Sequence, residues 1–176
     1  MDSGQSSLVL VNEIERLATR LRLREAEFEI LENVLASREL LAEQLPSGNP
    51  VSRGWISSPF GRRVDPIDGR QAFHAGVDFV GKAGSPVLAA GAGVVTWSGN
   101  KNEYGKTIEI THGQGLLTRY GHHDELSVEV GDIVRRGEVI GLMGSTGRAT
   151  GYHVHFEVEK DGEPVNPVEF LKKHRP

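Results

Sequence analysis

Residues 151–162, GYHVHFEVEKDG, place two histidines two positions apart in a run that alternates between apolar and polar side chains. Such alternation predicts a β-strand with one face against a core. His153 and His155 then share the other face with Glu157, and the two histidines are roughly 6.5–7 Å apart along the strand. At that separation one imidazole can bind a metal ion while the other reaches a group bound to that ion. The alternative is an exposed strand face that carries two unrelated histidines.

The segment AFHAGVDFV, residues 72–80, offers two more candidate metal ligands, His74 and Asp78. Gly76 lies between them, and VDFVG is typical of the start of a strand, so we expect a loop followed by a strand and not a helical turn. With His155 they would supply two nitrogens and one carboxylate oxygen. Three protein ligands with one position left to water are typical of catalytic zinc sites, whereas structural sites are closed and often rich in cysteine. A solvated loop with an ordinary histidine would give the same His-x-x-x-Asp pattern.

The segment TRYGHHDEL, residues 118–126, contains two adjacent histidines, His122 and His123. Alternation along a strand predicts that Thr118, Tyr120 and His122 share one face, and that His123 points away unless the strand has already ended. Tyr120 then either lends its hydroxyl to the site or packs as an ordinary strand aromatic.

Three segments together resemble a known family: ISSPFGRRVDPIDGRQAFHAGVDF, LLTRYGHH and GSTGRATGYHVHFEV. They are similar to the lysostaphin- and LytM-type zinc endopeptidases, which cut peptide cross-links of bacterial peptidoglycan, over about residues 51–170. His-x-x-x-Asp, Tyr-x-His and His-x-His occur in the family's order. The resemblance implies that His74, Asp78 and His155 bind zinc, and that His122 and His153 are the catalytic pair.

Two positions depart from the family's pattern without removing a named ligand. His123 stands where the family often has leucine, and Tyr152 replaces the commoner proline before the last motif. The spacing from Tyr120 favours His122 over its neighbour as the working histidine. The first of the three segments most resembles members from Gram-negative bacteria, which implies cross-links between D-Ala and diaminopimelate as the substrate.

The chemistry of amide hydrolysis agrees with this set of residues. The reaction needs an activated water, stabilisation of the tetrahedral oxyanion and a proton for the leaving amine. Zinc lowers the pKa of its bound water from 15.7 to about 7 and polarises the carbonyl, and two uncoordinated histidines can divide the remaining tasks. The sequence contains no His-Glu-x-x-His, no Gly-x-Ser-x-Gly and no cysteine, so the corresponding zincin, serine and thiol mechanisms are excluded.

The composition restricts the partners and the location of the chain. With 24 acidic and 20 basic residues in 176, it shows no basic groove or block for nucleic acid or a membrane surface. No apolar run approaches the roughly 20 residues that span a bilayer, and SSLVLVNEI is too short for a signal peptide. We therefore expect either a cytosolic protein or one whose targeting segment or membrane anchor lies outside this sequence. The family resemblance favours the periplasm or cell envelope.

The elements that must position these residues fall into two predicted domains. Residues 8–45 contain no glycine or proline and predict one long amphipathic helix, which packs against a partner helix as in a coiled coil or folds back on the rest of the chain. The breakers in LPSGNP, residues 45–50, end it and make a linker. We place the first domain at 1–46 and the second at 47–176. The stripe of the helix consists of Leu10, Ile14, Leu17, Leu21, Phe28, Leu31 and Leu35.

The second domain is predicted to be mainly β. Short β-rich runs alternate with glycine turns, which favours an antiparallel sheet sandwich or a barrel-like domain, and Asp161-Gly162 predicts a hairpin. The Gly-Asp-x-Val-x-x-Gly turn within residues 128–147 resembles biotinyl and lipoyl carrier domains. Those carriers need an exposed lysine, and none lies between Lys106 and Lys160.

Two readings stay open at this point. A non-catalytic relative could activate another cell-wall enzyme through the helix, although such a protein would be expected to have lost ligands. Three arginines that flank the His74 motif either meet a substrate carboxylate or only add surface charge: Arg62, Arg63 and Arg70.

Overall fold

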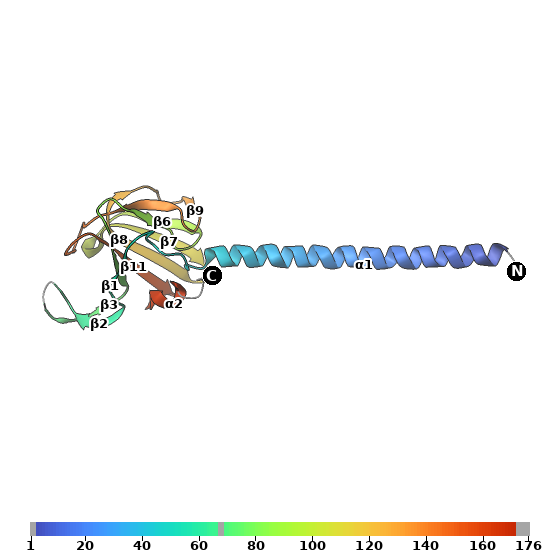
Figure 1. The fold of residues 1–176 in the computed structure, drawn as a ribbon, viewed down its shortest axis with the longest axis horizontal. Helices are drawn as coiled ribbons and strands as arrows, with labels where there is room; N and C mark the ends of the chain where they lie inside the picture. The colour runs from blue at the N-terminus through green and yellow to red at the C-terminus, as the bar shows by residue number, and fades with distance from the viewer. Residues whose placement is uncertain (1–2, 67–68, 172–176) are drawn as a thin grey trace. The chain divides into compact units, whose positions relative to one another are not determined.

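The structure is a computed structural model that describes residues 3–66 and 69–171, with side chains from residue 10 onward. The chain divides into two compact units, Met1–Ala42 and Glu43–Pro176. The predicted class is confirmed, because one long N-terminal helix precedes strands that are paired antiparallel throughout the described ranges (Figure 1).

Unit 1 contains the helix α1 (Ser3–Gln44) up to Ala42, and the last two helical residues belong to unit 2. The helix is continuous, as predicted. The side chains of its apolar stripe are exposed from Leu10 to Leu35. Arg24 occupies the position where the stripe would require an apolar residue, and it pairs with Glu27 at 2.6 Å on the exposed surface. An exposed pair of this kind contributes little to stability. In the parts of the chain that the structure describes, no helix is both long and apolar enough to cross a membrane.

The helix ends where the sequence predicted, and the segment after it belongs to unit 2. Pro46 and Pro50 are buried. The Gly48 amide donates to the Ala90 carbonyl at 2.7 Å, and the Leu88 amide donates to the Pro50 carbonyl at 2.9 Å. The predicted boundary between residues 46 and 47 therefore lies inside a packed segment, and not in an extended linker.

Unit 2 is built around one large sheet. Its strands neighbour one another in the order β1 (Trp55–Ser58), β4 (Val77–Val80), β11 (His153–Lys160), β8 (Leu116–Leu126), β7 (Gly105–Gly113), β6 (Gly93–Lys101) and β9 (Ile133–Val134). β10 (Val139–Met143) pairs with β8 and with β5 (Pro86–Leu88), and β12 (Glu163–Val165) pairs with β11. β2 (Gly61–Val64) and β3 (Gln71–His74) form a separate two-stranded sheet. The helical turns are η1 (Asn102–Tyr104) and α2 (Pro167–Leu171).

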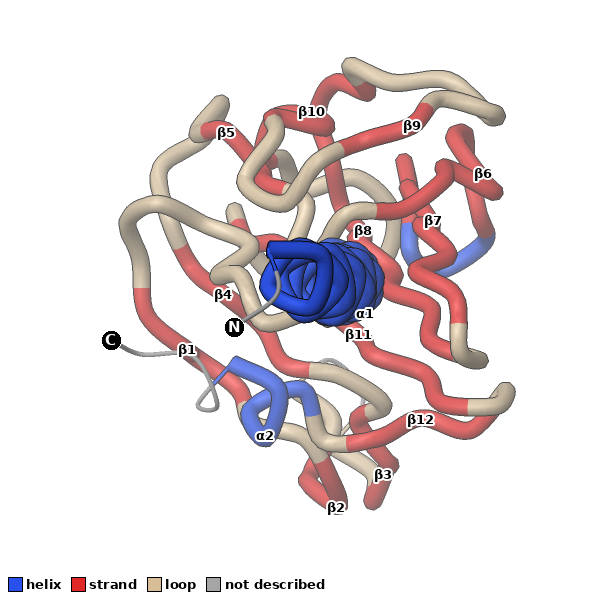
Figure 2. Tube along the Cα trace, turned by 90° about the vertical axis from the view of Figure 1, so that its right-hand side faces the viewer, coloured by secondary structure: helices blue, strands red, loops and turns tan. Residues whose placement is uncertain are grey.

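Three neighbouring strands, β4, β11 and β8, form the part of the sheet that carries the site (Figure 2). Their core faces meet through aromatic side chains. The Phe156 ring centroid lies 5.3 Å from that of Tyr120 and 6.4 Å from that of Phe79. Burying each such side chain is worth about 1.5–3 kcal/mol, so these contacts fix the three strands to one another.

The hairpin between β11 and β12 confirms the prediction made from Asp161-Gly162. Both residues have positive φ, 53° and 86°, and Lys160 lies opposite Glu163 across the turn. Two consecutive positive φ angles are typical of the tight turn that matches the twist of paired strands. This turn fixes the far end of the strand that carries His153 and His155.

Candidate metal centre

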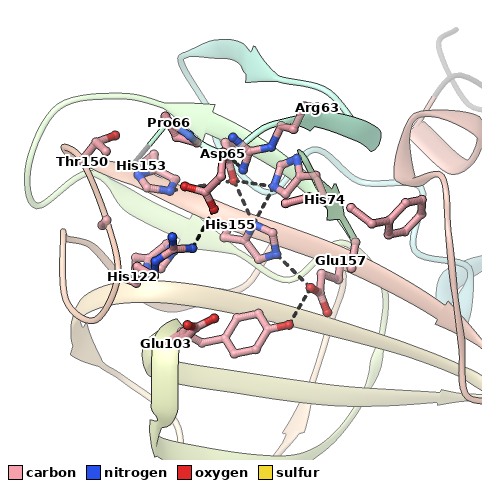
Figure 3. Close-up of a pocket in the computed structure, with 17 residues that line it drawn as sticks. Arg63, Asp65, Pro66, His74, Glu103, His122, Thr150, His153, His155 and Glu157 are labelled. Carbon is pink, nitrogen blue, oxygen red and sulfur yellow. Dashed lines mark hydrogen bonds and ion pairs between the residues drawn. The ribbon is translucent and has the colours of Figure 1, made fainter. Parts of the chain in front are cut away.

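The side chains of β11 divide between two environments, as their alternation predicted. One set is buried in the core: Val154, Phe156 and Val158. The other set lines a pocket on the opposite face: His153, His155 and Glu157 (Figure 3). The hydrophobic set therefore fixes the register that presents the two imidazoles to the pocket.

β3 and β4 bring His74 and Asp78 to the same pocket. The prediction of a strand at Asp78 and no helical turn is confirmed, but His74 ends a strand and does not lie in a loop. His74 is the last residue of β3, and Asp78 lies in β4 directly opposite His155. Gly76 makes this approach possible, because a β-carbon there would lie 2.4 Å from the carbonyl oxygen of Phe156. Any larger residue would force the turn away from β11 and separate His74 from its partners.

Three side-chain atoms converge in this pocket. His74 Nε2 lies 3.1 Å from His155 Nδ1 and 3.2 Å from Asp78 Oδ1, and the last two atoms are 2.8 Å apart. Their residues form the group of His, Asp and Glu side chains that is arranged to hold a metal ion in the described part of the chain. All three are buried, so a bound ion would be shielded from bulk water on the protein side.

The protons on the two imidazoles leave lone pairs facing this point. The other nitrogen of His74, Nδ1, lies 2.8 Å from the Pro59 carbonyl oxygen and donates to it. The other nitrogen of His155, Nε2, lies 2.9 Å from Glu157 Oε1 and donates to that carboxylate. Two ring nitrogens 3.1 Å apart, both with lone pairs inward, fit a cation between them. The donor set therefore fits a zinc ion.

The charges around the cluster favour a cation as well. Burial alone would raise the pKa of Asp78. When the inner ring nitrogens carry protons in place of a cation, they donate hydrogen bonds to Asp78, and those from His155 and His74 hold the pKa of Asp78 well below its ordinary value. Burial alone would lower the pKa of His155, but hydrogen bonds to Asp78 and Glu157 raise it to about 9. The two carboxylates thus create a negative potential at the point of convergence.

His122 and His153 lie beside this cluster and outside it. His122 Nδ1 donates to the Thr146 carbonyl at 2.7 Å, and His153 Nδ1 donates to the Gly151 carbonyl at 2.8 Å. Each ring therefore keeps Nε2 available to accept a proton, and Nε2 of His153 lies 3.8 Å from Asp78 Oδ1. The ring centroids are 4.6 Å apart, and burial lowers the pKa of His122 to about 4. Both imidazoles line the pocket, which is the arrangement that two proton-transfer groups require.

The prediction that Thr118, Tyr120 and His122 share a strand face is confirmed for Thr118 and Tyr120, whose hydroxyls are 3.0 Å apart, and is wrong for His122. Tyr120 is fully buried, and its hydroxyl accepts a hydrogen bond from the Ala90 amide at 2.8 Å. His122 has φ of 65°, so the chain departs from the extended conformation there and the imidazole turns to the pocket. The Tyr120 hydroxyl is therefore part of the core and does not reach the candidate site.

His123 is placed in the interior of the domain. Its side chain is fully buried, and Nδ1 donates to the Lys106 carbonyl at 3.2 Å. Nε2 has no hydrogen-bond partner in the described part of the chain. His122 lines the pocket and its neighbour does not, which agrees with the preference drawn from the Tyr120 spacing.

Tyr104 is a pocket residue to which the sequence analysis assigned no role. Its hydroxyl donates to Glu157 Oε1 at 2.9 Å, and burial and the Glu157 charge raise its pKa to about 12. Glu157 thus accepts from both Tyr104 and His155, and Arg119 pairs with its second oxygen. The alternation of side chains along the strand did indicate that Glu157 lies on the same face as His155. Tyr104 is the last residue of the single turn η1, which is too short to show a sequence period.

Comparison with known proteins gives a consistent set of similarities. The sequence profile described as Peptidase family M23 matches residues 72–167. The DD-carboxypeptidase/endopeptidase Mpg of Neisseria meningitidis serogroup B is 48% identical over 113 residues, which are 64% of this chain and 26% of that protein. The chain thus spans about a quarter of the length of this curated relative.

Two solved structures resemble unit 2 in fold and in sequence. A zinc-containing peptidase from Vibrio cholerae matches with a TM-score of 0.64 and 38% identity, over 72% of this chain and 39% of that one. The catalytic domain of lysostaphin from Staphylococcus simulans matches with a TM-score of 0.63 and 32% identity, over 68% of this chain and 93% of that one.

Proposed function

The chain belongs to peptidase family M23, as its resemblance to lysostaphin-type enzymes implied, and on this premise we propose that it is a zinc-dependent endopeptidase that hydrolyses peptide cross-links of bacterial peptidoglycan. The observation that carries the proposal is the convergence of two imidazoles and one carboxylate beside two further histidines with free nitrogens. The relative Mpg is named a DD-carboxypeptidase/endopeptidase, and this name supports cleavage of a bond between two D-configured centres, which a cross-link between D-Ala and diaminopimelate contains.

His74, Asp78 and His155 would hold the zinc ion. Zinc bound there would supply a Lewis acid for the amide carbonyl and would lower the pKa of water from 15.7 to about 7. The contribution of the chain is to orient the ligands. The Pro59 carbonyl fixes the ring of His74, and the Glu157 carboxylate fixes the ring of His155. Such partners make the ligands more basic and hold their tautomers.

His122 and His153 would carry out the proton transfers. Each has Nδ1 occupied by a backbone carbonyl, so Nε2 is the atom that accepts a proton from the attacking water or returns one to the leaving amine. Once protonated, the same ring can donate a hydrogen bond to the developing oxyanion. The low pKa of His122 keeps this ring neutral before the reaction begins.

The alternative function, a non-catalytic factor that activates another hydrolase, has weaker support. A factor of that kind has no need for ligands or proton-transfer groups. In this chain the five positions hold histidine or aspartate, residue types that could bind zinc and transfer protons, and all five line one pocket: His74, Asp78, His122, His153 and His155.

The proposal also covers where the protein is located in the cell and what its helix α1 binds. A peptidoglycan substrate places the protein in the periplasm or elsewhere in the cell envelope. The exposed apolar stripe from Leu10 to Leu35 favours a coiled-coil contact with a second copy or with another protein.

The test is digestion of purified sacculi from a Gram-negative bacterium with the zinc-loaded protein. Mass analysis should show cross-linked muropeptide dimers converted to monomers, and a chelator should block the change. Shortened glycan with intact cross-links would identify a glycosidase instead. No change with zinc bound, also after removal of α1, would favour the activator.

A further inference from the structure

We propose that Arg63 binds a free carboxylate on the leaving side of the scissile amide. By doing so, Arg63 selects peptides whose amide nitrogen is attached to a carbon that also carries a carboxylate. This inference deepens the proposed function and rests on it, because it concerns the specificity of the same pocket.

Arg63 is directed into the pocket by the alternation of β2. Its side chain is 28% exposed and lines the pocket, and Figure 3 shows it beside His74. Arg62, one position earlier, is exposed and is not part of the pocket lining. Adjacent residues of a strand point to opposite faces. The two arginines therefore carry the same guanidinium group, but only Arg63 faces the pocket.

The guanidinium of Arg63 retains unused hydrogen-bonding capacity. Within the described ranges its one charged partner is Asp78, whose Oδ2 lies 3.7 Å away. Charge-assisted hydrogen bonds are about 2.7–2.9 Å long, and a guanidinium has five N–H donors in a planar fork. By contrast, Arg148 on the same pocket wall pairs with Asp65 at 2.8 Å. An incoming anion would therefore disrupt a weaker ion pair at Arg63 than at Arg148.

The position of Arg63 limits which anion this is. Asp78 presents Oδ1 to His74 and His155, and its other oxygen, Oδ2, to Arg63. The carboxylate of Asp78 thus lies between the Arg63 guanidinium and the point where the amide must react. A group bound by Arg63 has to lie within a few bonds of the scissile amide.

Cross-links between D-Ala and diaminopimelate carry such a group. The nitrogen that leaves is attached to a carbon of diaminopimelate whose carboxylate is free, and a terminal D-Ala–D-Ala bond has the same arrangement. Inside a glycine bridge the corresponding carboxyl group is itself part of an amide. A planar guanidinium matches the two oxygens of a carboxylate, so it distinguishes these two classes of substrate.

The experiment uses the zinc-loaded full chain and two synthetic cross-linked peptides that differ only in this carboxylate, which is free in one and amidated in the other. The wild-type protein should prefer the free carboxylate by about 10–100-fold in kcat/KM, since a hydrogen bond to a charged group is worth that factor. Most of the difference should lie in KM. In Arg63→Gln the preference should fall to near one, through a loss on the free carboxylate alone. Arg62→Gln, the matched control, should keep the wild-type ratio.

Binding of the same two peptides, measured by calorimetry, separates this inference from the proposed function. If the zinc-loaded wild type cleaves neither peptide, the proposed function fails, but tighter binding of the free carboxylate that Arg63→Gln removes would still support the role of Arg63. Equal binding of the two peptides by the wild type, or an unchanged preference in Arg63→Gln, would overturn it. Should Arg63→Gln lose zinc or its fold, Arg63→Lys keeps the charge without the fork and should show an intermediate preference.

Discussion

The carbonyl oxygen of Thr146 accepts a hydrogen bond from His122 Nδ1 at 2.7 Å, and the hydroxyl of the same residue donates to the His123 carbonyl at 2.7 Å. The hydroxyl also accepts from the Lys106 amide at 3.0 Å. One threonine thus joins the loop after β10 to β7 and β8, and its carbonyl sets the tautomer of His122. The free Nε2 of that imidazole depends on this contact.

Replacing Thr146 by valine should therefore lower hydrolysis about 10–100-fold without loss of zinc, because the carbonyl loses its anchor and the imidazole its alignment. Thr146→Ser keeps the hydroxyl and should restore most of the activity. The ¹⁵N shifts of His122 report the tautomer directly. An unchanged tautomer and unchanged activity in Thr146→Val would remove this role.

Zinc content and activity should separate the two groups of pocket histidines. Alanine at His74, Asp78 or His155 removes one of three ligands, so elemental analysis should show the metal lost. Alanine at His122 or His153 should leave zinc bound and reduce turnover by about 10²–10⁴-fold, the usual worth of a positioned proton-transfer group.

The alanine variant of His123 is the control for these alanine variants of the pocket residues. Alanine at this buried position should lower the free energy of unfolding, because it leaves a cavity between β8 and β10, but it should not change the zinc content. Full zinc in His155→Ala, or near wild-type turnover in zinc-loaded His122→Ala, would contradict the assignment.

The carboxylate of Glu157 should matter for zinc affinity although it does not belong to the converging donor atoms. Glu157→Gln keeps the shape of the side chain but removes the charge that faces His155 Nε2, and the affinity should fall about 10–100-fold. Glu159→Gln is the control. It lies on the same strand, pairs with Arg119 at 3.0 Å and should leave zinc affinity unchanged. Equal affinities in a competition titration would count against the role of Glu157.

The contribution of His112 to stability should fall as the pH drops below neutrality. Its nitrogens contact the Ala92 carbonyl at 2.8 Å and the Thr118 hydroxyl at 2.7 Å, and burial lowers its pKa below 6.5. The unfolded chain therefore binds this proton first. The contribution is complete above about pH 6.5 and is lost as the pH falls through the folded-state pKa.

Denaturant midpoints measured between pH 7.5 and pH 5 check this. The wild type should lose more stability over the interval than His112→Gln, which cannot titrate. Part of the slope should persist in the variant, because burial also lowers the pKa of His123, to about 4. Identical slopes for the two proteins would show that His112 takes no part.

The apolar stripe of α1 predicts self-association or binding to another protein. Light scattering of the full chain against a fragment should show the difference. The fragment should begin at residue 43, since the Glu43 carbonyl accepts from the Ala92 amide within unit 2. A monomeric full chain with α1 sensitive to protease, and with no other protein retained on the helix, would leave the stripe without this function.

Much of the candidate site could be predicted from the sequence, since its signals are local. The period of two along β11 placed His153, His155 and Glu157 on one face, and Gly76 indicated that His74 and Asp78 do not share a helical turn. The class of unit 2 followed from short β-rich runs between glycines, because strands and turns are encoded over a few residues.

The features that could not be predicted depend on contacts between distant segments. Alternation placed His122 with Tyr120, but a single positive φ at His122 reverses its direction. Tyr104 acquires its position only when η1 packs against Glu157. The segment at 45–50 has the composition of a linker, and backbone hydrogen bonds to Leu88 and Ala90 make it part of unit 2.

β11 lies between β4 and β8 in space and near the end of the chain in sequence. Synthesis from the N-terminus therefore produces His74, Asp78 and His122 before His155. β11 pairs with β4 on one side and with β8 on the other, so it joins parts of the sheet that come earlier in the chain. A chain that ends before β11 lacks His155, and with it one of the three side chains that converge in the candidate metal centre.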